Sequence, residues 1–265
     1  MRLHITHTTR FTYDQPISEA YTEVRLRPLD HAGQRCLGFH LHTEPREEVL
    51  SYIDPFGNRV HHFDVLQPHA RLEMTAESEV STTEIFTEPI RALSPLDMWS
   101  FTQPTTYAPF TPEVVAFGQT QRVAGDPSAS AVGLMRAIFS EIKYEKGATT
   151  VTTTAPQALA LRRGVCQDFA HIFLAASRSQ GLAARYVSGY LYSDGDSAAS
   201  HAWVDVFVPG RGWLALDPTH NSAQNGHYVR LAIGRDYADV PPTRGVYKGA
   251  GHETLEVSVT FRELN

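Results

Sequence analysis

Gly164-Val165-Cys166-Gln167-Asp168-Phe169-Ala170 is the stretch that decides the fold of this chain, because it opens a helix with a cysteine in its first turn. The apolar residues of that helix recur at helical spacing, at Phe169, Ile172, Phe173 and Ala176. Gly181 is a natural end for it. The N–H groups and the positive dipole end at a helix start favour a thiolate, the nucleophilic form. The alternative is a buried structural cysteine, because free cysteines are among the most buried residues.

The composition is that of a globular protein, with 265 residues of which 42% are hydrophobic and 20% charged. The formal net charge of -6 provides no basic surface, so we expect no nucleic-acid partner. No apolar run approaches a membrane helix and no signal peptide is evident, so we expect no membrane partner and a cytoplasmic location. Cys36 and Cys166 are too few and too far apart for a disulfide framework, and we expect them to be unpaired. The oligomeric state stays open.

The first part of the chain has the pattern of an antiparallel β domain. Short alternating segments separated by turns run from Arg2 to about Val80, and they predict a β-sandwich-like N-terminal domain over residues 1–90. Histidines in these strands lack a recurring acidic or thiol partner, so we interpret them as exposed strand residues rather than metal ligands. A stretch spotted with prolines, residues 91–127, predicts a connecting segment.

The second part of the chain alternates helical and strand patterns, which predicts an α+β core over residues 128–250. Helices should begin at Asp126-Pro127-Ser128 and at Thr154-Ala155-Pro156, where a capping side chain precedes a proline. A threonine-rich loop, residues 149–154, could border a substrate groove or be a solvated surface loop. Residues 251–265 alternate as a closing β-strand, and we expect it to return to a sheet, with the N-terminal domain as one place for it.

A predicted hairpin supplies the partners that a nucleophilic cysteine needs. His201 begins its first strand and Asp217 ends its second, so the two should lie at the same edge of the sheet. The imidazole can exchange a proton with the thiol, and the carboxylate can orient the imidazole. A regular four-residue loop at Pro209–Gly212 would place the two side chains on opposite faces. We therefore predict an odd-length loop or a bulge there.

The motifs of the chain resemble those of the bacterial transglutaminase-like proteins, which are described as candidate cysteine proteases with a β-rich N-terminal region. The resemblance rests on Gly-Val-Cys-Gln-Asp-Phe-Ala-His (164–171), Ala-Arg-Tyr-Val-Ser-Gly-Tyr-Leu (184–191), Ser-His-Ala-Trp-Val-Asp-Val-Phe-Val-Pro-Gly-Arg-Gly-Trp (200–213) and Leu-Asp-Pro-Thr (216–219). It covers the whole chain, including the tail at residues 234–247. It implies a papain-like core, a helix with an N-terminal cysteine packed on an antiparallel sheet, in which Cys166, His201 and Asp217 are the catalytic triad.

Other residues have weaker assignments. The Cys166 N–H should contribute to an oxyanion hole, and Tyr144 and Gln167 are candidates for the second donor or for lining the site. Asp168, in the first turn, is interpreted as a helix N-terminal carboxylate. Trp203 could shield the site or simply pack in the core. Asp236 and Tyr237 could also line the site, because their segment is unlike a solvated tail.

Three functions follow from this pattern. The first is hydrolysis of a peptide, isopeptide or other amide through a thioester on Cys166. The second is an amine-accepting transglutaminase, which shares the same acyl-enzyme, and the third is a non-catalytic binding scaffold. The sequence predicts no cofactor and no metal, and it lacks the acidic cluster of a calcium-activated enzyme. The natural substrate cannot be derived, because specificity depends on loops.

Overall fold

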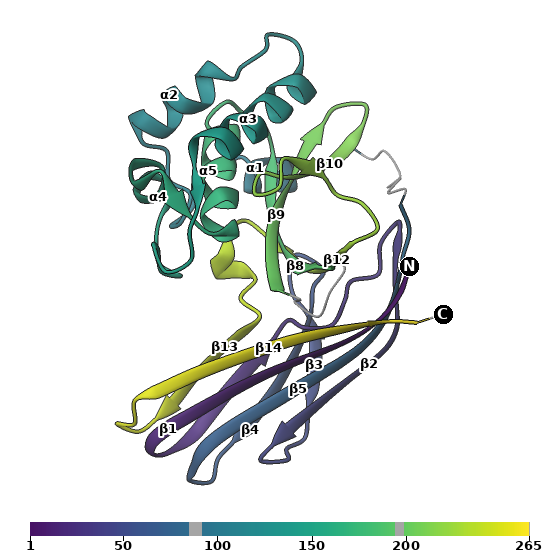
Figure 1. Cartoon of the computed structure of the whole chain (residues 1–265), viewed down its shortest axis with the longest axis vertical. Helices are drawn as coiled ribbons and strands as arrows, with labels where there is room; N and C mark the ends of the chain where they lie inside the picture. The colour runs from purple at the N-terminus through teal and green to yellow at the C-terminus, as the bar shows by residue number, and fades with distance from the viewer. Residues whose placement is uncertain (85–91, 194–198, 265) are drawn as a thin grey trace.

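The computed structural model of the chain describes residues 1–84, 92–193 and 199–264, which form two groups of elements (Figure 1). One group is a large sheet that contains both the N-terminal and the C-terminal strands. The other is a smaller sheet covered by helices. This arrangement confirms the predicted α+β class with a β-rich N-terminal region.

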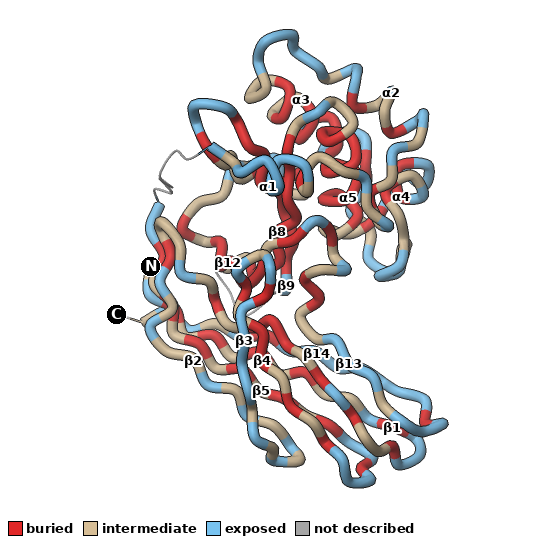
Figure 2. Tube along the Cα trace, turned by 180° about the vertical axis from the view of Figure 1, so that it is seen from behind, coloured by how far each residue is buried: buried red, intermediate tan, exposed pale blue. Residues whose placement is uncertain are grey.

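One long strand, β1 (Arg2–Val24), organises the N-terminal sheet, whose order is β2-β5-β1-β4-β3. Its first half pairs with β5, and its last residues pair with β4. The pairing shifts register between Thr12 and Ile17, where β1 passes from its pairing with β5 to its pairing with β4. Buried residues alternate with partly exposed ones along most of β5, so one face of this curled sheet forms a core (Figure 2). The remaining bounds are β2 (Gln34–Glu44), β3 (Leu50–Ile53), β4 (Arg59–Val65) and β5 (His69–Thr82).

The end of the chain returns to this sheet, as predicted for the closing strand. β14 (Glu253–Glu263) pairs antiparallel with the first half of β1, and β13 (Thr243–Lys248) pairs with its second half. β13 thus joins the N-terminal sheet from within residues 128–250. The residue ranges given for the domains stay a prediction, and the boundary between residues 90 and 91 lies outside the described residues.

The segment predicted as a connection contains two helices, α1 (Pro95–Ser100) and α2 (Pro112–Thr120). Two further helices begin where capping residues predicted them, α3 (Pro127–Glu141) and α4 (Ala155–Leu161). Asp126 Oδ1 accepts a hydrogen bond of 2.8 Å from the Ala129 N–H, which is the capping contact expected of this residue. The helices α2, α3 and α4 form a layer against the central helix α5 (Cys166–Arg178).

The core sheet has the order β11-β10-β9-β8-β12 and is antiparallel throughout. Its strands are β8 (Ala184–Leu191), β9 (Ala199–Val208), β10 (Gly212–Asp217), β11 (Ser222–Ala223) and β12 (Tyr228–Gly234). α5 packs on β8 and β9 on one side and on α2, α3 and α4 on the other. The helix is therefore buried almost all round after its first turn (Figure 2).

The β9–β10 hairpin has the register that the sequence argument requires. Gly212 pairs with Val208, so the loop contains three residues, 209–211. Gly210 and Gly212 have φ angles of 78° and 83°, which glycine adopts without strain. In this register Asp217 falls opposite Trp203, two residues from His201, so the side chains of His201 and Asp217 share one face. The predicted odd-length loop is confirmed.

Candidate active site

The start of α5 is held by a carboxylate within its own first turn. Asp168 Oδ2 accepts hydrogen bonds from the Val165 N–H at 2.8 Å and from the Thr149 hydroxyl at 2.6 Å. A Cβ at Gly164 would lie 2.5 Å from the same oxygen, so only glycine fits there. Burial raises the pKa of Asp168, and these hydrogen bonds oppose that rise. The interpretation of Asp168 as a helix N-terminal carboxylate is confirmed, and its contacts fix the turn that carries Cys166.

His201 and Asp217 lie together at the edge of the core sheet. His201 Nε2 is 2.7 Å from Asp217 Oδ2, and both side chains are buried. A carboxylate has no proton to donate, so His201 donates through Nε2. Cys166 is the second group that acts on this ring, since its interaction with His201 helps to raise the pKa of the imidazole. The three residues selected from the sequence are therefore brought into one chain of contacts.

The pKa of His201 is raised to about 9. Burial alone would lower it, but the hydrogen bonds to Asp217 and Cys166 outweigh that effect. The ring therefore carries a proton at neutral pH. An imidazolium beside a thiol favours the thiolate.

Asp217 is fully buried and accepts hydrogen bonds from several directions. Besides His201, Oδ2 accepts from His220 Nδ1 at 2.8 Å and from the Tyr228 hydroxyl at 2.8 Å. Oδ1 accepts from the backbone N–H groups of Thr219 at 2.8 Å and His220 at 3.3 Å. Burial would raise the pKa of Asp217, but the donors lower it well below the usual range. The residue stays a carboxylate at every physiological pH.

Sequence reasoning missed His220 and Tyr228. Asp217, Pro218, Thr219 and His220 form a turn in which the aspartate side chain accepts backbone N–H bonds, and Asp-Pro followed by a hydroxyl residue is typical of such turns. That signal could have indicated His220 as a neighbour of Asp217. No local signal indicates Tyr228, because it arrives from the next long strand.

Trp203 is completely buried behind the imidazole. Its ring lies 6.1 Å from that of His201, and its Nε1–H donates to Gln224 Oε1 at 3.1 Å. A Cβ at Gly189 would lie 2.5 Å from the indole, so the glycine on β8 makes room for it. Trp203 therefore packs in the core and supports one face of His201.

Tyr144 and Gln167 have different neighbours in the structure. Tyr144 is in β6 (Lys143–Tyr144), which pairs with β7 (Arg163–Gly164) just before the cysteine. It is 46% exposed, and burial together with the charge of Cys166 raises its pKa. It lines a pocket of about 390 Å³ together with His201 and His220. Gln167 instead donates its amide to Val151 O at 2.9 Å, in the threonine-rich loop.

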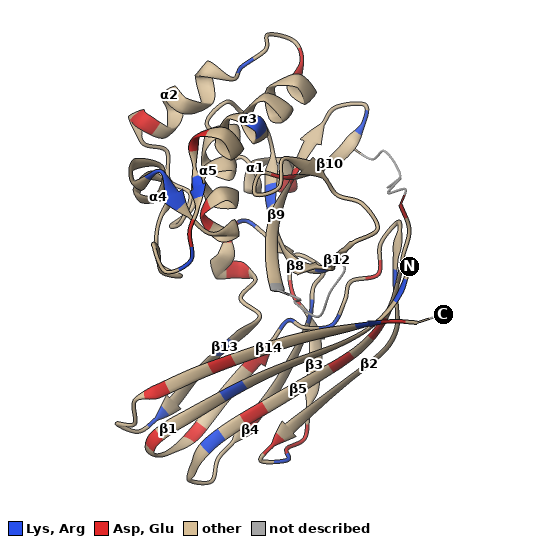
Figure 3. Ribbon diagram, in the orientation of Figure 1, with Lys and Arg blue, Asp and Glu red and all other residues tan. Residues whose placement is uncertain are grey.

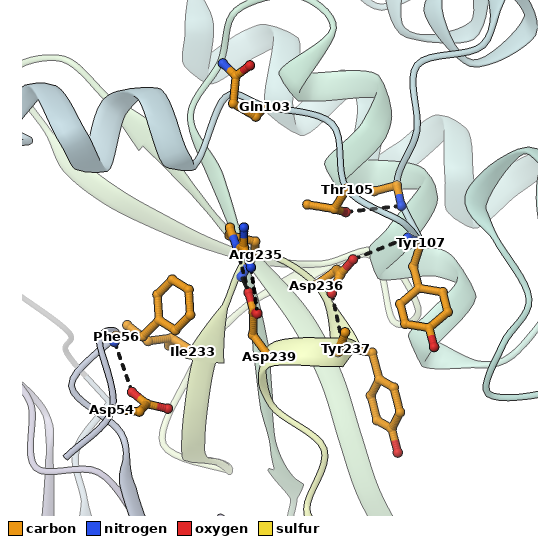
Figure 4. Close-up of polar contacts among 12 residues, drawn as sticks. Asp54, Phe56, Gln103, Thr105, Tyr107, Ile233, Arg235, Asp236, Tyr237 and Asp239 are labelled. Atoms are coloured by element: carbon orange, nitrogen blue, oxygen red, sulfur yellow. Dashed lines mark hydrogen bonds and ion pairs between the residues drawn. The ribbon is translucent and has the colours of Figure 1, made fainter. Parts of the chain in front are cut away.

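The structure separates the roles of Asp236 and Tyr237 (Figure 4). Asp236 is buried and accepts from the Ala238 N–H at 2.8 Å and the Tyr107 N–H at 3.3 Å, so it caps the short helix η1 (Tyr237–Asp239). The Tyr237 N–H donates to His171 Nε2 at 3.3 Å. Burial lowers the pKa of His171 to about 3, so this ring is neutral and can accept. Tyr237 lines a cavity that is described below.

Among the described residues, one group of side chains could hold a metal ion, and it coincides with this site. The ligand atoms of His201, Asp217 and His220 lie within 4.8 Å of one another. In the structure, the two rings already share Asp217 Oδ2 as a hydrogen-bond acceptor. The two cysteines are unpaired, as predicted. None of the described helices is long and apolar enough to span a membrane.

Two family models match the chain. Residues 3–81 match the bacterial transglutaminase-like N-terminal region, and residues 116–218 match the transglutaminase-like superfamily. An uncharacterised protein of Mycobacterium leprae is 33% identical over 279 residues, covering 99% of each chain. The protein-glutamine gamma-glutamyltransferase of Pseudomonas aeruginosa is 29% identical over 137 residues, which are 44% of this chain and 20% of that protein.

A solved structure has the same fold. A "putative cysteine protease" from Cytophaga hutchinsonii superimposes with a TM-score of 0.77 over 100% of this chain and 92% of that chain, at 21% identity. At this identity the likeness shows the fold alone. Taken with the family models and the mycobacterial relative, it leads to one conclusion: this chain belongs to the transglutaminase-like superfamily, with a bacterial transglutaminase-like N-terminal region.

Proposed function

We propose that this protein catalyses cysteine-dependent acyl transfer, in which Cys166 takes the acyl group of an amide and water then receives it. The observation that carries the proposal is the chain of contacts from Cys166 through His201 to the buried Asp217. Superfamily membership supports cysteine-based catalysis in general terms.

In the first half-reaction, the Cys166 thiolate attacks the amide carbonyl carbon and a C–S bond forms. The His201 imidazolium gives its proton to the departing nitrogen as the C–N bond breaks, which leaves a thioester and a neutral imidazole. In the second half-reaction, the imidazole removes a proton from water as the water oxygen attacks the thioester. The C–S bond then breaks, and the carboxylic acid and the thiolate–imidazolium pair are formed.

The tetrahedral intermediates need donors for their oxyanion. The Cys166 N–H lies at the first position of α5, where a helix leaves its N–H groups without intrahelical partners. For the second donor, the Tyr144 hydroxyl is a better choice than the Gln167 amide, because that amide already donates to Val151 O. Asp217 holds the imidazole in the required tautomer and stabilises its charged form.

The second candidate is transfer to an amine, which would make the protein a transglutaminase. The partial match to a protein-glutamine gamma-glutamyltransferase favours it, although the match spans only 20% of that protein. Both reactions pass through the same thioester and differ in whether an amine or water attacks it. Two unpaired cysteines suit a reducing compartment, so a cytoplasmic location is part of this proposal.

Substrate profiling tests the proposal and separates the two reactions. The full chain is incubated with libraries of glutamine-containing peptides and of γ-glutamyl amides, with and without a fluorescent primary amine. Hydrolysis releases ammonia or an amine regardless of the added amine, whereas a transglutaminase incorporates the fluorophore. Cys166→Ala is the matched control and should be inactive with every substrate. Turnover that survives in Cys166→Ala would contradict the proposal.

A further inference from the structure

A groove lies between the two outer strands of the N-terminal sheet, β13 and β14. Both pair with β1, and within the described residues neither has a second neighbouring strand. The cavity between them has a volume of about 390 Å³. Its walls include Phe11, Tyr13, Thr243, Tyr247, Leu255 and Val257. We call it the β13/β14 groove.

The walls of the β13/β14 groove are mainly apolar, with Glu253 among the polar residues, and they are partly open to solvent. Val246, Leu255 and Val257 are 69%, 53% and 51% exposed. The outer face of the same strands is polar, where Arg10 on β1 forms ion pairs with Glu73 on β5 and Glu256 on β14 (Figure 3). Sheet faces that are apolar and exposed mark surfaces that bind a partner.

One end of the groove reaches the candidate active site. Val151, Ser200 and Tyr237 line this end. Val151 O accepts the hydrogen bond from Gln167, the neighbour of Cys166. Ser200 immediately precedes His201 and also lines the pocket that contains His201 and His220. The two cavities therefore share Ser200, the residue next to His201, as a lining residue.

We propose that the β13/β14 groove binds an extended polypeptide segment of the substrate, and that this segment leads the scissile carbonyl to Cys166. The inference rests on the proposed function. It names the substrate class as a protein or peptide that has apolar side chains next to the amide that reacts. Edge strands offer N–H and C=O groups that an added strand can pair with. Alternate side chains of the added strand would enter the apolar groove.

It follows from the proposal that a small amide is a poorer match than an extended segment. A free γ-glutamyl amide fills only the pocket beside His201 and leaves the exposed apolar walls of β13 and β14 uncovered. An extended segment covers both, and it removes the apolar side chains of Leu255 and Val257 from water. Binding energy from this remote part of the substrate can then orient the reacting amide.

Peptide binding to the full-length Cys166→Ala protein tests the inference without requiring turnover. Two fluorescein-labelled eight-residue peptides are compared by anisotropy, one alternating valine with serine and one alternating glutamate with serine. We expect the valine peptide to bind at least about tenfold more tightly, because its side chains leave water. N-methylation of alternate backbone nitrogens should weaken binding in one register and leave it unchanged in the other, as expected for strand addition.

Matched variants locate the binding surface. Leu255→Asp should weaken binding of the valine peptide at least about tenfold, because a short charged side chain would face the apolar ligand. Thr254→Asp on the same strand is the control and should bind normally, because Thr254 does not line the groove. Val246→Asp, on the more exposed wall, gives the same test should Leu255→Asp fail to fold.

The inference is overturned if the two peptides bind equally, if neither binds, or if Leu255→Asp and Thr254→Asp behave alike. It is also overturned if Leu255→Asp converts a dimer to a monomer in sedimentation, which would assign the groove to a second copy of the chain. Failure of the proposed function is seen separately, as loss of Cys166 reactivity towards a small electrophile that does not need the groove.

Discussion

Two buried carboxylates of the core sheet, Asp205 and Asp217, differ in the kind of cation that faces them. Asp205 on β9 is held by Arg185 Nε at 2.7 Å and by both terminal nitrogens of Arg230, at 2.6 and 2.9 Å. Asp217, at the end of β10, is held by His201, His220 and Tyr228. Both side chains are fully buried.

The difference between the two sites lies in which partner can lose a proton. Burial would raise the pKa of Asp205, but the two guanidinium groups lower it, and a guanidinium keeps its proton at every physiological pH. The Asp205 cluster is therefore an ion-pair network that stays charged and links β8, β9 and β12. The imidazole beside Asp217 can give up its proton and take it back, so the same kind of buried ion pair becomes able to do chemistry.

The largest effect on catalytic activity is expected from a substitution in the His201–Asp217 pair. Asp217→Asn should lower turnover of the best amide from substrate profiling by about 10⁴-fold, because the amide favours the wrong imidazole tautomer. Far-ultraviolet circular dichroism should be unchanged. Glu141→Gln, which changes an exposed carboxylate on α3, should keep full activity. A loss below tenfold in Asp217→Asn would show that the carboxylate is structural only.

A substitution in the Asp205 ion-pair network should change the stability of the protein rather than its catalytic activity. Asp205→Ala should lower the free energy of unfolding by about 3–5 kcal/mol, because it leaves the buried Arg230 cation without its main counter-charge. Urea unfolding measures this. Glu256→Ala, which removes an exposed pair with Arg10, should cost no more than about 1 kcal/mol. Equal losses of unfolding free energy in the two variants would contradict a stabilising role of the Asp205 ion-pair network.

The two sites should also differ in their pH dependence. The folded-state pKa of His201 is raised from 6.5 to about 9, so its stabilising contribution is fully present below pH 6.5 and is lost as the pH rises through about 9. The histidine NMR titration should have its midpoint near 9 and move lower in Asp217→Asn. Between pH 6 and pH 10, His201→Gln should lose less stability than the unmodified protein. A His201 midpoint near 6.5 would remove the basis for an imidazolium at neutral pH.

The smallest effect is expected at the second histidine. His220→Ala removes one of several donors to Asp217, and its side chain is half exposed. We expect turnover to fall about two- to tenfold, which corresponds to the loss of one ordinary hydrogen bond. Steady-state kinetics give the value. A loss of about 10³-fold would mean that His220 takes part in proton transfer and that the assignment of His201 alone is incomplete.

The elements that local patterns specify were predictable from the sequence. Helical spacing placed Cys166 at the start of α5, and the ends of the hairpin placed His201 and Asp217 together, down to the odd-length loop. These features depend on contacts within a helix or between strands joined by a short turn. The periodicity of the apolar residues and the residue preferences of short turns are enough to predict them.

Features that depend on distant pairing were not predictable. β13 and β14 return to pair with β1 from more than 200 residues away, and no local pattern encodes that choice. Arg230 reaches Asp205 in the same way, from a different strand. The helices α1 and α2 were interpreted as a connection because prolines dominate the pattern, although prolines at positions 95 and 112 begin these helices.

Labelling of the two cysteines tests the central claim most directly. The full chain is treated at pH 7 with an electrophilic amide-like probe, and peptide mass spectrometry measures the rate of modification at Cys166 and at Cys36. The account predicts rapid labelling of Cys166, little labelling of Cys36, and a large drop at Cys166 alone in His201→Ala. Absence of labelling at Cys166, or an unchanged rate there in His201→Ala, would contradict the account.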